Sequence, residues 1–174
     1  MTLALAACGG GDTKAAAFNE EDLPRLVLQP SDVPTGLLYS VDRSREFEAD
    51  STDGDEGHER LKALGLQGVR FALFESDDGE VQVTSGAFRF GDSDGASRAL
   101  DYMREIGKEP LFGSELATNV AADGLGEESW GLHSGDDISY GFRVGNVFIL
   151  LVTFGDVDAR ALAEKAAERV SARQ

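Results

Sequence analysis

The strongest hydrophobic pattern of the chain lies over residues 138–170. Apolar residues alternate with polar or small ones from Ile138 to Val144, which is typical of a strand with one buried face. Gly145-Asn146 suits a two-residue hairpin turn. Val147 to Phe154 is nearly all apolar and predicts a central strand that is covered on both faces. After Gly155 the apolar spacing becomes helical, so this region predicts a hairpin followed by an amphipathic helix.

A second region with the same order of patterns precedes it. Residues 69–74 alternate as a strand, and Asp78-Gly79 is a strong hairpin turn signal. The return strand, residues 81–90, changes the parity of its apolar positions at Ser85-Gly86, which predicts a β-bulge. Residues 93–106 then have helical apolar spacing, so a helix is predicted to follow this hairpin as well.

The two helices share similar entries, Phe90-Gly91-Asp92 and Phe154-Gly155-Asp156. Either the chain contains two related ββα halves, or a glycine turn and an aspartate cap have recurred by convergence. Both alternatives predict the same α+β fold class. We expect a single domain in which an antiparallel sheet of about five to six strands carries two long amphipathic helices.

The other segments have weaker patterns. Residues 19–22 predict a short helical turn, and the proline-bounded turn at 29–36 leads into a strand near 37–41. A short helix is expected at 58–65 and a strand around Trp130. Residues 110–126 are expected to form a long irregular connection.

An acidic segment, residues 42–60, has no periodicity and is interpreted as an exposed loop within the domain at 19–174. Asp50, Asp53, Asp55 and Glu56 raise the alternative of a weak calcium site, because hard cations bind carboxylate oxygens. Their spacing does not match a known calcium loop. We therefore predict no metal ligands here.

The amino terminus changes the expected location of the protein. Leu5-Ala6-Ala7-Cys8 resembles the lipobox of bacterial lipoproteins, in which the cysteine receives a lipid and becomes the new amino terminus. Residues 1–7 are then the remnant of a signal peptide, and residues 8–18 a flexible tether rich in glycine. Cys8, the single cysteine, is the predicted lipidation site. The alternative is a cytosolic protein with a chance Leu-Ala-Ala-Cys.

Charge and missing motifs narrow the possible functions. The formal net charge of −16 opposes binding to nucleic acid or to an anionic membrane surface. There is no nucleophile elbow, zinc-protease motif, phosphate loop or dinucleotide fingerprint, so we predict no enzyme and no cofactor. His58 is expected to be solvated in the acidic segment. A triad of His133, Ser134 and Asp136 is unfavourable, because sequence neighbours on a turn rarely converge on one point.

Three short motifs resemble a family of secreted bacterial lipoproteins of mostly unknown function. They are LQPSDVPTG at 28–36, GLGEES at 124–129 and FRVGNV at 142–147, and the family's usual middle motif carries aspartate where this chain has Glu127. Similar patterns occur in extracellular sensor-like domains attached to bacterial serine/threonine kinases. The resemblance implies an α+β extracytoplasmic domain and offers no catalytic residue.

These observations lead to a first functional hypothesis. The protein is expected to be a non-enzymatic, sensor-like binding domain, anchored by its lipid to the outer face of the cell membrane, for a small molecule, a glycan or a protein. One alternative is a carrier that encloses a hydrophobic ligand between its sheet and helices. Another is a hydrolase of unrecognised type.

Overall fold

The structure, a computed structural model, describes residues 17–50, 56–108 and 117–173 of the 174-residue chain. In these ranges the chain forms seven strands, five α-helices and one 3-10 turn. Their order is η1 (Glu20–Asp22), α1 (Leu23–Leu26), β1 (Leu38–Tyr39), α2 (Val41–Asp50), α3 (Glu56–Ala63), β2 (Leu66–Glu75), β3 (Gln82–Phe90), α4 (Ser93–Lys108), β4 (Thr118–Val120), β5 (Glu128–Ser134), β6 (Asp137–Val144), β7 (Val147–Phe154) and α5 (Ala159–Ser171).

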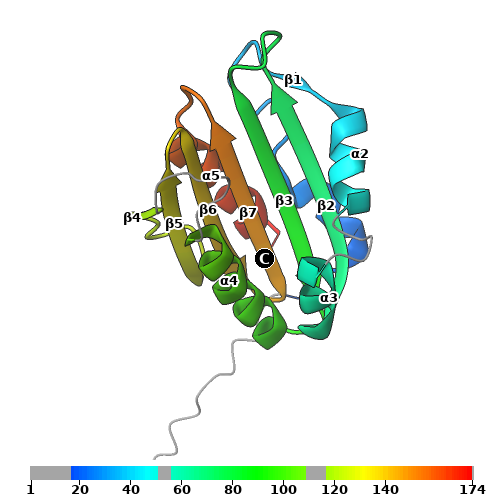
Figure 1. Cartoon of the computed structure of the whole chain (residues 1–174). Coiled ribbons are helices and arrows are strands. Elements are labelled where there is room, and N and C mark those ends of the chain that lie inside the picture. Colours follow the sequence, from blue (N-terminus) through cyan, green and yellow to red (C-terminus); the bar gives the residue numbers. More distant parts are fainter. Residues whose placement is uncertain (1–16, 51–55, 109–116, 174) are drawn as a thin grey trace, which may run out of the picture.

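All seven strands belong to one antiparallel sheet with the order β1-β2-β3-β7-β6-β5-β4 (Figure 1). Both predicted hairpins are present, β2–β3 and β6–β7, and their second strands pair at the centre of the sheet. The α+β class and the antiparallel sheet are therefore confirmed. The strand missing from the prediction is β4, which lies in the segment expected to be irregular. Three residues paired only with β5 leave no periodic pattern.

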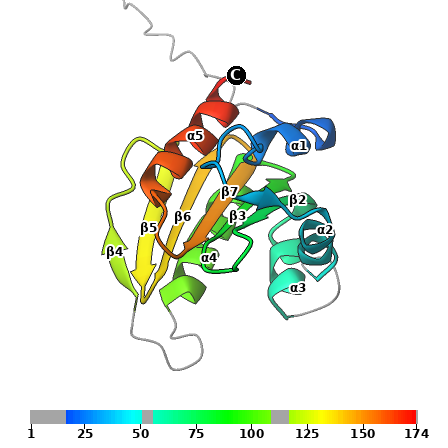
Figure 2. The ribbon, with the colours of Figure 1, turned by 90° about the horizontal axis from the view of Figure 1, so that it is seen from above.

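Helices cover both faces of the sheet (Figure 2). The two long helices expected from the pattern are α4 and α5, and they lie on opposite faces. The short helix α1 accompanies α5, and α3 accompanies α4. No helix in the described ranges is long and apolar enough to cross a lipid bilayer.

Each face of the sheet has its own hydrophobic core. Phe142 and Ile149 lie in the core beneath α1 and α5, whereas Trp130 and Phe148 lie in the core beneath α3 and α4. Phe142 and Phe148 are fully buried, and Trp130 is 6% exposed. Because neighbouring strand residues point to opposite faces, a strand such as β7 supplies both cores and must be apolar throughout.

The same double covering corrects the predicted bulge at Ser85-Gly86. The register of β3 with β7 is continuous from Gln82 to Arg89, so no residue is inserted there. Val83 faces one core and Phe88 the other, which explains why the apolar parity changes without a bulge. The irregularity of this hairpin lies in β2, between Leu66 and Gly68.

The acidic segment at 42–60 is not a loop in its described part. Residues 41–50 form α2 and residues 56–60 begin α3, while residues 51–55 lie outside the described ranges. The Ser44 hydroxyl accepts the Leu73 N–H at 3.0 Å, and the Glu48 carboxylate accepts the Phe71 N–H at 3.0 Å. Four residues apart on α2, Ser44 and Glu48 therefore satisfy the edge of β2 beyond the two-residue strand β1.

The opposite placement of α4 and α5 bears on the two interpretations of the repeated helix entry. A twofold rotation that exchanges the antiparallel neighbours β3 and β7 has its axis perpendicular to the sheet, so it would leave both helices on one face. The two helices pack against different faces. The halves are therefore not related by a simple rotation. Asp92 and Asp158 nevertheless both accept a backbone N–H three residues on, from Gly95 at 2.7 Å and from Ala161 at 2.9 Å.

Candidate functional site

The residues singled out for lipid or metal chemistry fall mostly outside the described ranges. Cys8, Asp53 and Asp55 lie in the segments that are not described, and of Asp50 only the backbone is described. Glu56 is exposed at the start of α3. Within the described part of the chain, no three His, Cys, Asp or Glu side chains are arranged to hold a metal ion.

The two histidines have different environments. His133 is exposed on β5, and Asp136 is exposed in the turn that follows it, so the unfavoured triad would lie on an open hairpin. His58 was expected to be solvated, but it is 5% exposed and lies on α3 against the sheet. The reason is that α3 packs on the core, with Leu61 one turn further along.

Two of the motifs that carry the family resemblance contact each other and have a structural role. Arg143 lies 2.6 Å from the Glu127 carboxylate and 2.9 Å from that of Glu128, and it donates a hydrogen bond to the Gly145 carbonyl at 3.0 Å. Its side chain is only 10% exposed. The Ser97 hydroxyl, followed by Arg143, holds the pKa of Glu128 below its ordinary value. This network joins α4, β5 and β6 and contains no exposed reactive group.

Asn146 in the third motif connects distant segments. Its side-chain oxygen accepts the Phe18 N–H at 2.7 Å, and its amide nitrogen donates to the carbonyls of Phe18 at 3.1 Å and Phe90 at 3.0 Å. Phe18 itself is buried in the core. The folded domain therefore includes Phe18, which the sequence had placed at the end of the tether.

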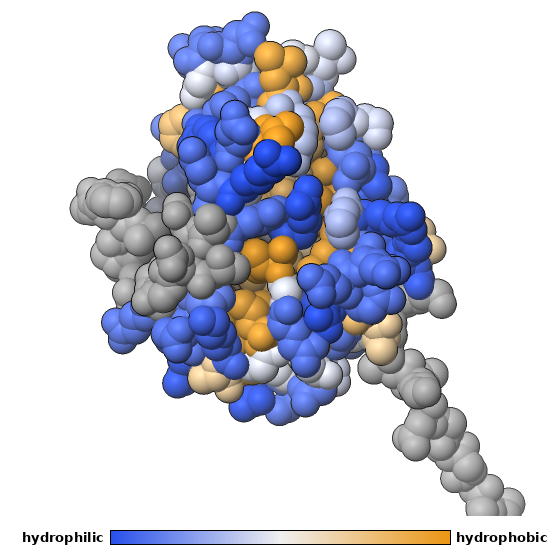
Figure 3. Space-filling view, turned by 90° about the vertical axis from the view of Figure 1, so that its right-hand side faces the viewer, coloured by the Kyte–Doolittle hydropathy of each residue, from blue (hydrophilic) through white to orange (hydrophobic). Residues whose placement is uncertain are grey.

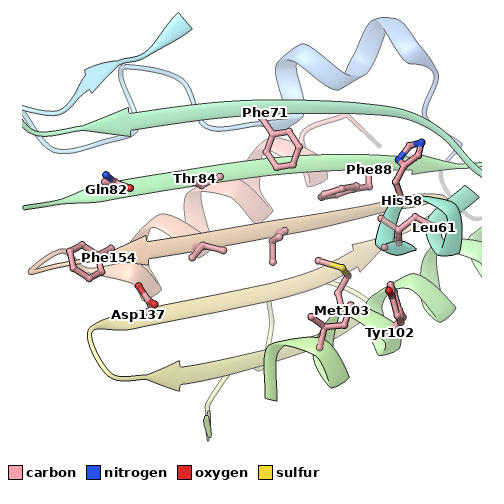
Figure 4. Close-up of a pocket in the computed structure, with 14 residues that line it drawn as sticks. His58, Leu61, Phe71, Gln82, Thr84, Phe88, Tyr102, Met103, Asp137 and Phe154 are labelled. Atoms are coloured by element: carbon pink, nitrogen blue, oxygen red, sulfur yellow. The ribbon is translucent and has the colours of Figure 1, made fainter. Parts of the chain in front are cut away.

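The candidate site is a groove of about 510 Å³ on the face of the sheet between α3 and α4 (Figure 4). Its floor comes from the two central strands, where Thr84 pairs with Val152. Phe88 continues the floor, stacked on Phe148 at 5.3 Å between ring centroids, and Phe71 meets Phe88 edge-on at 5.5 Å. The floor is therefore mainly apolar and aromatic.

A glycine in β3 shapes this floor. A Cβ atom on Gly86 would lie 2.7 Å from Cε1 of Phe71 and 3.0 Å from Cε2 of Phe88. Only a residue without a side chain leaves room for the two rings to lie across the sheet at this point.

Helices supply the walls of the groove. His58 and Leu61 project from α3, and Tyr102 and Met103 project from α4 on the other side (Figure 4). The guanidinium of Arg60 lies 6.0 Å from the centre of the Tyr102 ring, which connects the two helices at this end. Tyr102 and Met103 were expected to fill the core, whereas both are half-buried at the groove.

The groove exists because α4 is held toward one side of the sheet. The indole N–H of Trp130 on β5 donates to the Leu100 carbonyl at 2.9 Å, and the Ser97 hydroxyl donates to Glu128 at 2.6 Å. The Trp130 ring lies so close to Gly141 that a Cβ there would be 2.4 Å from it. These contacts fix α4 over β5 and β6, and the groove lies beside it over β3 and β7.

The end of the groove away from α3 is polar. Phe154 pairs with Gln82 on one side and with Asp137 on the other, so the three form one row across the sheet. Figure 4 shows these three residues at the opposite end from His58 and Tyr102. Local burial, followed by the neighbouring charge of Asp136, raises the pKa of Asp137 above its ordinary value. A carboxylate thus lies beside an exposed aromatic ring, since Phe154 is 42% exposed.

This arrangement suits binding better than covalent chemistry. A volume of about 510 Å³ is in the range of small-molecule sites, which combine a mostly apolar lining with a few polar groups. His58 and Asp137, the titratable groups that a catalyst would use together, lie at opposite ends of the groove. The sequence did not predict the groove, because its residues come from α3, β2, β3, α4, β6 and β7, and only the sheet order brings them together.

Comparison with known proteins adds a likeness of fold. No protein-family model and no curated protein sequence matches the chain. The structure is similar to the extracellular domain of PknH from Mycobacterium tuberculosis, with a TM-score of 0.56 and 11% identity over 91% of this chain and 99% of that chain. An uncharacterised Mycobacterium smegmatis protein, the Rv0999 ortholog, aligns at a TM-score of 0.42 and 15% identity over 86% of this chain and 82% of that one.

At this level of identity, the PknH likeness concerns the fold alone. It agrees with the coarse part of the sequence resemblance, which predicted an α+β domain similar to extracellular domains. The individual motifs and the lipid anchor stay predictions.

Proposed function

We propose that this protein is an extracytoplasmic, sensor-like binding domain without enzymatic activity, and that it takes a small apolar ligand in the groove between α3 and α4. The observation that carries the proposal is the floor of the groove. Phe71 and Phe88 are buried beneath neighbouring helices, but Leu150 and Val152 on the same face are only half-buried. A ligand lying on β3 and β7 would complete the burial of this face.

The fold of an extracellular domain supports the extracytoplasmic part of the proposal. The lipid on Cys8 rests on the lipobox and supplies the membrane anchor. An anchored domain with a ligand groove can report a small molecule outside the cell, or concentrate it there.

The two alternative functions fit the site less well. A carrier with an enclosed cavity would need space within the core, whereas Trp130, Phe142 and Phe148 are buried in two packed clusters and the groove is open to the surface. A hydrolase would need a nucleophile beside its acid or base. At the end of the groove that holds Asp137, the adjoining residues are Gln82 and Phe154.

A neutral fluorescent dye, N-phenyl-1-naphthylamine, tests whether the groove binds apolar molecules. We expect saturable fluorescence enhancement with the 174-residue chain. Val152→Trp should weaken dye binding about tenfold, because a larger side chain on the floor occupies the groove. An unchanged thermal melt would show that this variant is folded.

Leu38→Ser is the matched control, since Leu38 is 60% exposed on β1, on the side of the molecule shown in Figure 3 and away from the groove. This variant should bind the dye as the wild type does. Loss of binding in Leu38→Ser with full binding in Val152→Trp would place the dye on the β1 edge and contradict the proposal.

A further inference from the structure

The charge of the groove is of one sign. Of the fourteen residues that line it, Asp137 is the only carboxylate, and none is lysine or arginine. Apart from His58, whose ring lies at the other end, the lining has no group that could neutralise Asp137. Within the described part of the chain, no cationic side chain forms an ion pair with Asp137.

The surroundings of Asp137 make this carboxylate costly in the free protein. Local burial and the adjacent Asp136 both disfavour its charged form and raise its pKa. A cation placed against it would reverse both effects, because the cation supplies an opposite charge at close range. The whole chain adds to the attraction, since its formal net charge is −16.

The apolar part of the groove adjoins this charge directly. Leu150, Val152 and Phe154 follow one another at every second position of β7 and so point to the same face. At the usual rise of a strand, they span about 13 Å. Phe154 lies next to Asp137 in the register of the sheet, so an apolar chain on β7 would bring its end to the carboxylate.

We infer that the groove takes a small amphipathic cation, with an alkyl or aryl body on β3 and β7 and an ammonium head against Asp137 and Phe154. This inference rests on the proposed binding function and specifies its ligand class. The ammonium pairs with the carboxylate and lies against the exposed ring of Phe154, an arrangement that proteins use for organic cations. A fatty acid has the same body but places its negative head beside Asp137, and is therefore disfavoured.

Three probes with one body and different heads test this ligand class: octylammonium, 1-octanol and octanoate, each below its micelle concentration at pH 7. The chain contains two methionines, and Met103 lines the groove. A methyl-labelled methionine sample therefore reports binding at the groove through the Met103 resonance. We expect octylammonium to bind about fivefold more tightly than octanol, as for a partly exposed ion pair, and octanoate to bind more weakly than octanol.

Two variants remove the same charge at neighbouring positions. Asp137→Asn should abolish the preference for octylammonium over octanol and leave octanol binding unchanged. It should melt no lower than the wild type, because the lost carboxylate has a raised pKa in the folded chain. Asp136→Asn changes the net charge equally, but Asp136 does not line the groove. Most of the preference should therefore remain in this variant.

The outcomes separate this inference from the proposed function. Equal binding of the three probes, a preference for octanoate, or an unaltered cation preference in Asp137→Asn would overturn the cationic ligand class while leaving an apolar groove. Failure of all three probes to shift Met103 would instead contradict the proposed binding function itself.

Discussion

Asp32, in the proline-bounded turn before β1, joins the first part of the domain to its last helix. Its carboxylate accepts the Gln29 N–H at 2.7 Å and forms an ion pair with Arg169 on α5. Burial alone would raise the pKa of Asp32, but the Arg169 hydrogen bond, the Gln29 N–H and the charges of Arg169 and Lys165 together lower it. The folded state is therefore stabilised by the ionised form of Asp32.

This pKa shift predicts an acid-dependent loss of stability. Because the pKa of Asp32 is lower in the folded chain, its contribution is complete above the ordinary value of about 3.9 and is lost as the pH falls through the folded value. Asp32→Asn should lower the free energy of unfolding by about 1–3 kcal/mol at pH 7, and the difference from the wild type should shrink below pH 4. Urea denaturation at several pH values measures both effects.

Asp156→Asn is the control for this prediction, because Asp156 is exposed in the turn before α5 and the charge change is the same. It should leave the free energy of unfolding nearly unchanged. A constant difference between Asp32→Asn and the wild type from pH 7 to pH 3 would show that the ionisation of Asp32 is not involved.

Individual residues were predictable where local chemistry decides their role. Gly145 has a φ of +57°, as the hairpin turn requires, and Asp158 caps α5. The role of Asp137 was not predictable, because Asp136-Asp137 is an ordinary turn sequence. Only the pairing of β6 with β7 places that carboxylate beside Phe154 at the end of the groove.

Among the elements, α2 is the clearest departure from the sequence pattern. Its sequence, VDRSREFEAD, has few apolar residues, so it does not show the stripe of a core-facing helix. The helix instead supplies oxygen acceptors to the backbone of β2. It takes the place of a longer edge strand where β1 ends after two residues.

Ser44→Ala tests this function of α2. The Ser44 hydroxyl accepts the Leu73 N–H and donates to the Ser40 carbonyl at 2.6 Å, and Ser44 is 1% exposed. Its removal leaves a buried N–H without a partner, so we expect the free energy of unfolding to fall by about 1–3 kcal/mol. Chemical denaturation measures this loss, and hydrogen exchange should show faster exchange of the Leu73 amide.

Ser171→Ala, at the exposed end of α5, provides the comparison and should change the stability by less than about 0.5 kcal/mol. Equal effects of the two substitutions would mean that the contact between α2 and β2 contributes nothing to stability.

Elements with strong periodicity were predicted well, and those defined by partners were not. The hairpins and the two long helices follow from apolar spacing that is visible in the sequence. In contrast, β4 exists through its pairing with β5, and the continuous register of β3 became clear only once both faces of the sheet were known to be covered. The groove depends on the same information, because it lies where two helices leave the sheet partly open.

At the scale of the whole molecule, the folded domain begins at Phe18 and requires nothing of Cys8. Within the described ranges, the core is built from Phe18 onward. Cys8→Ser, expressed behind a complete signal peptide, should therefore leave the membrane fraction and give a soluble domain with an unchanged melting temperature. Fractionation and thermal melting provide the two measurements.

Retention of Cys8→Ser in membranes would show that the anchor lies elsewhere in the chain. Loss of cooperative folding in the same variant would show that the amino-terminal segment belongs to the core, and the lipobox interpretation would then be wrong.

The hydrogen bonds between Phe18 and Asn146 also determine which way an anchored molecule faces. Asn146 lies in the turn before β7, and Phe154 and Asp137 lie at the far end of the same hairpin, about 23 Å away at the usual rise of an eight-residue strand. A tether that leaves the domain at Phe18 departs from the end opposite the acidic row. The mouth beside Asp137 would then point away from the bilayer, so its ligand would arrive from the surrounding medium and not out of the lipid.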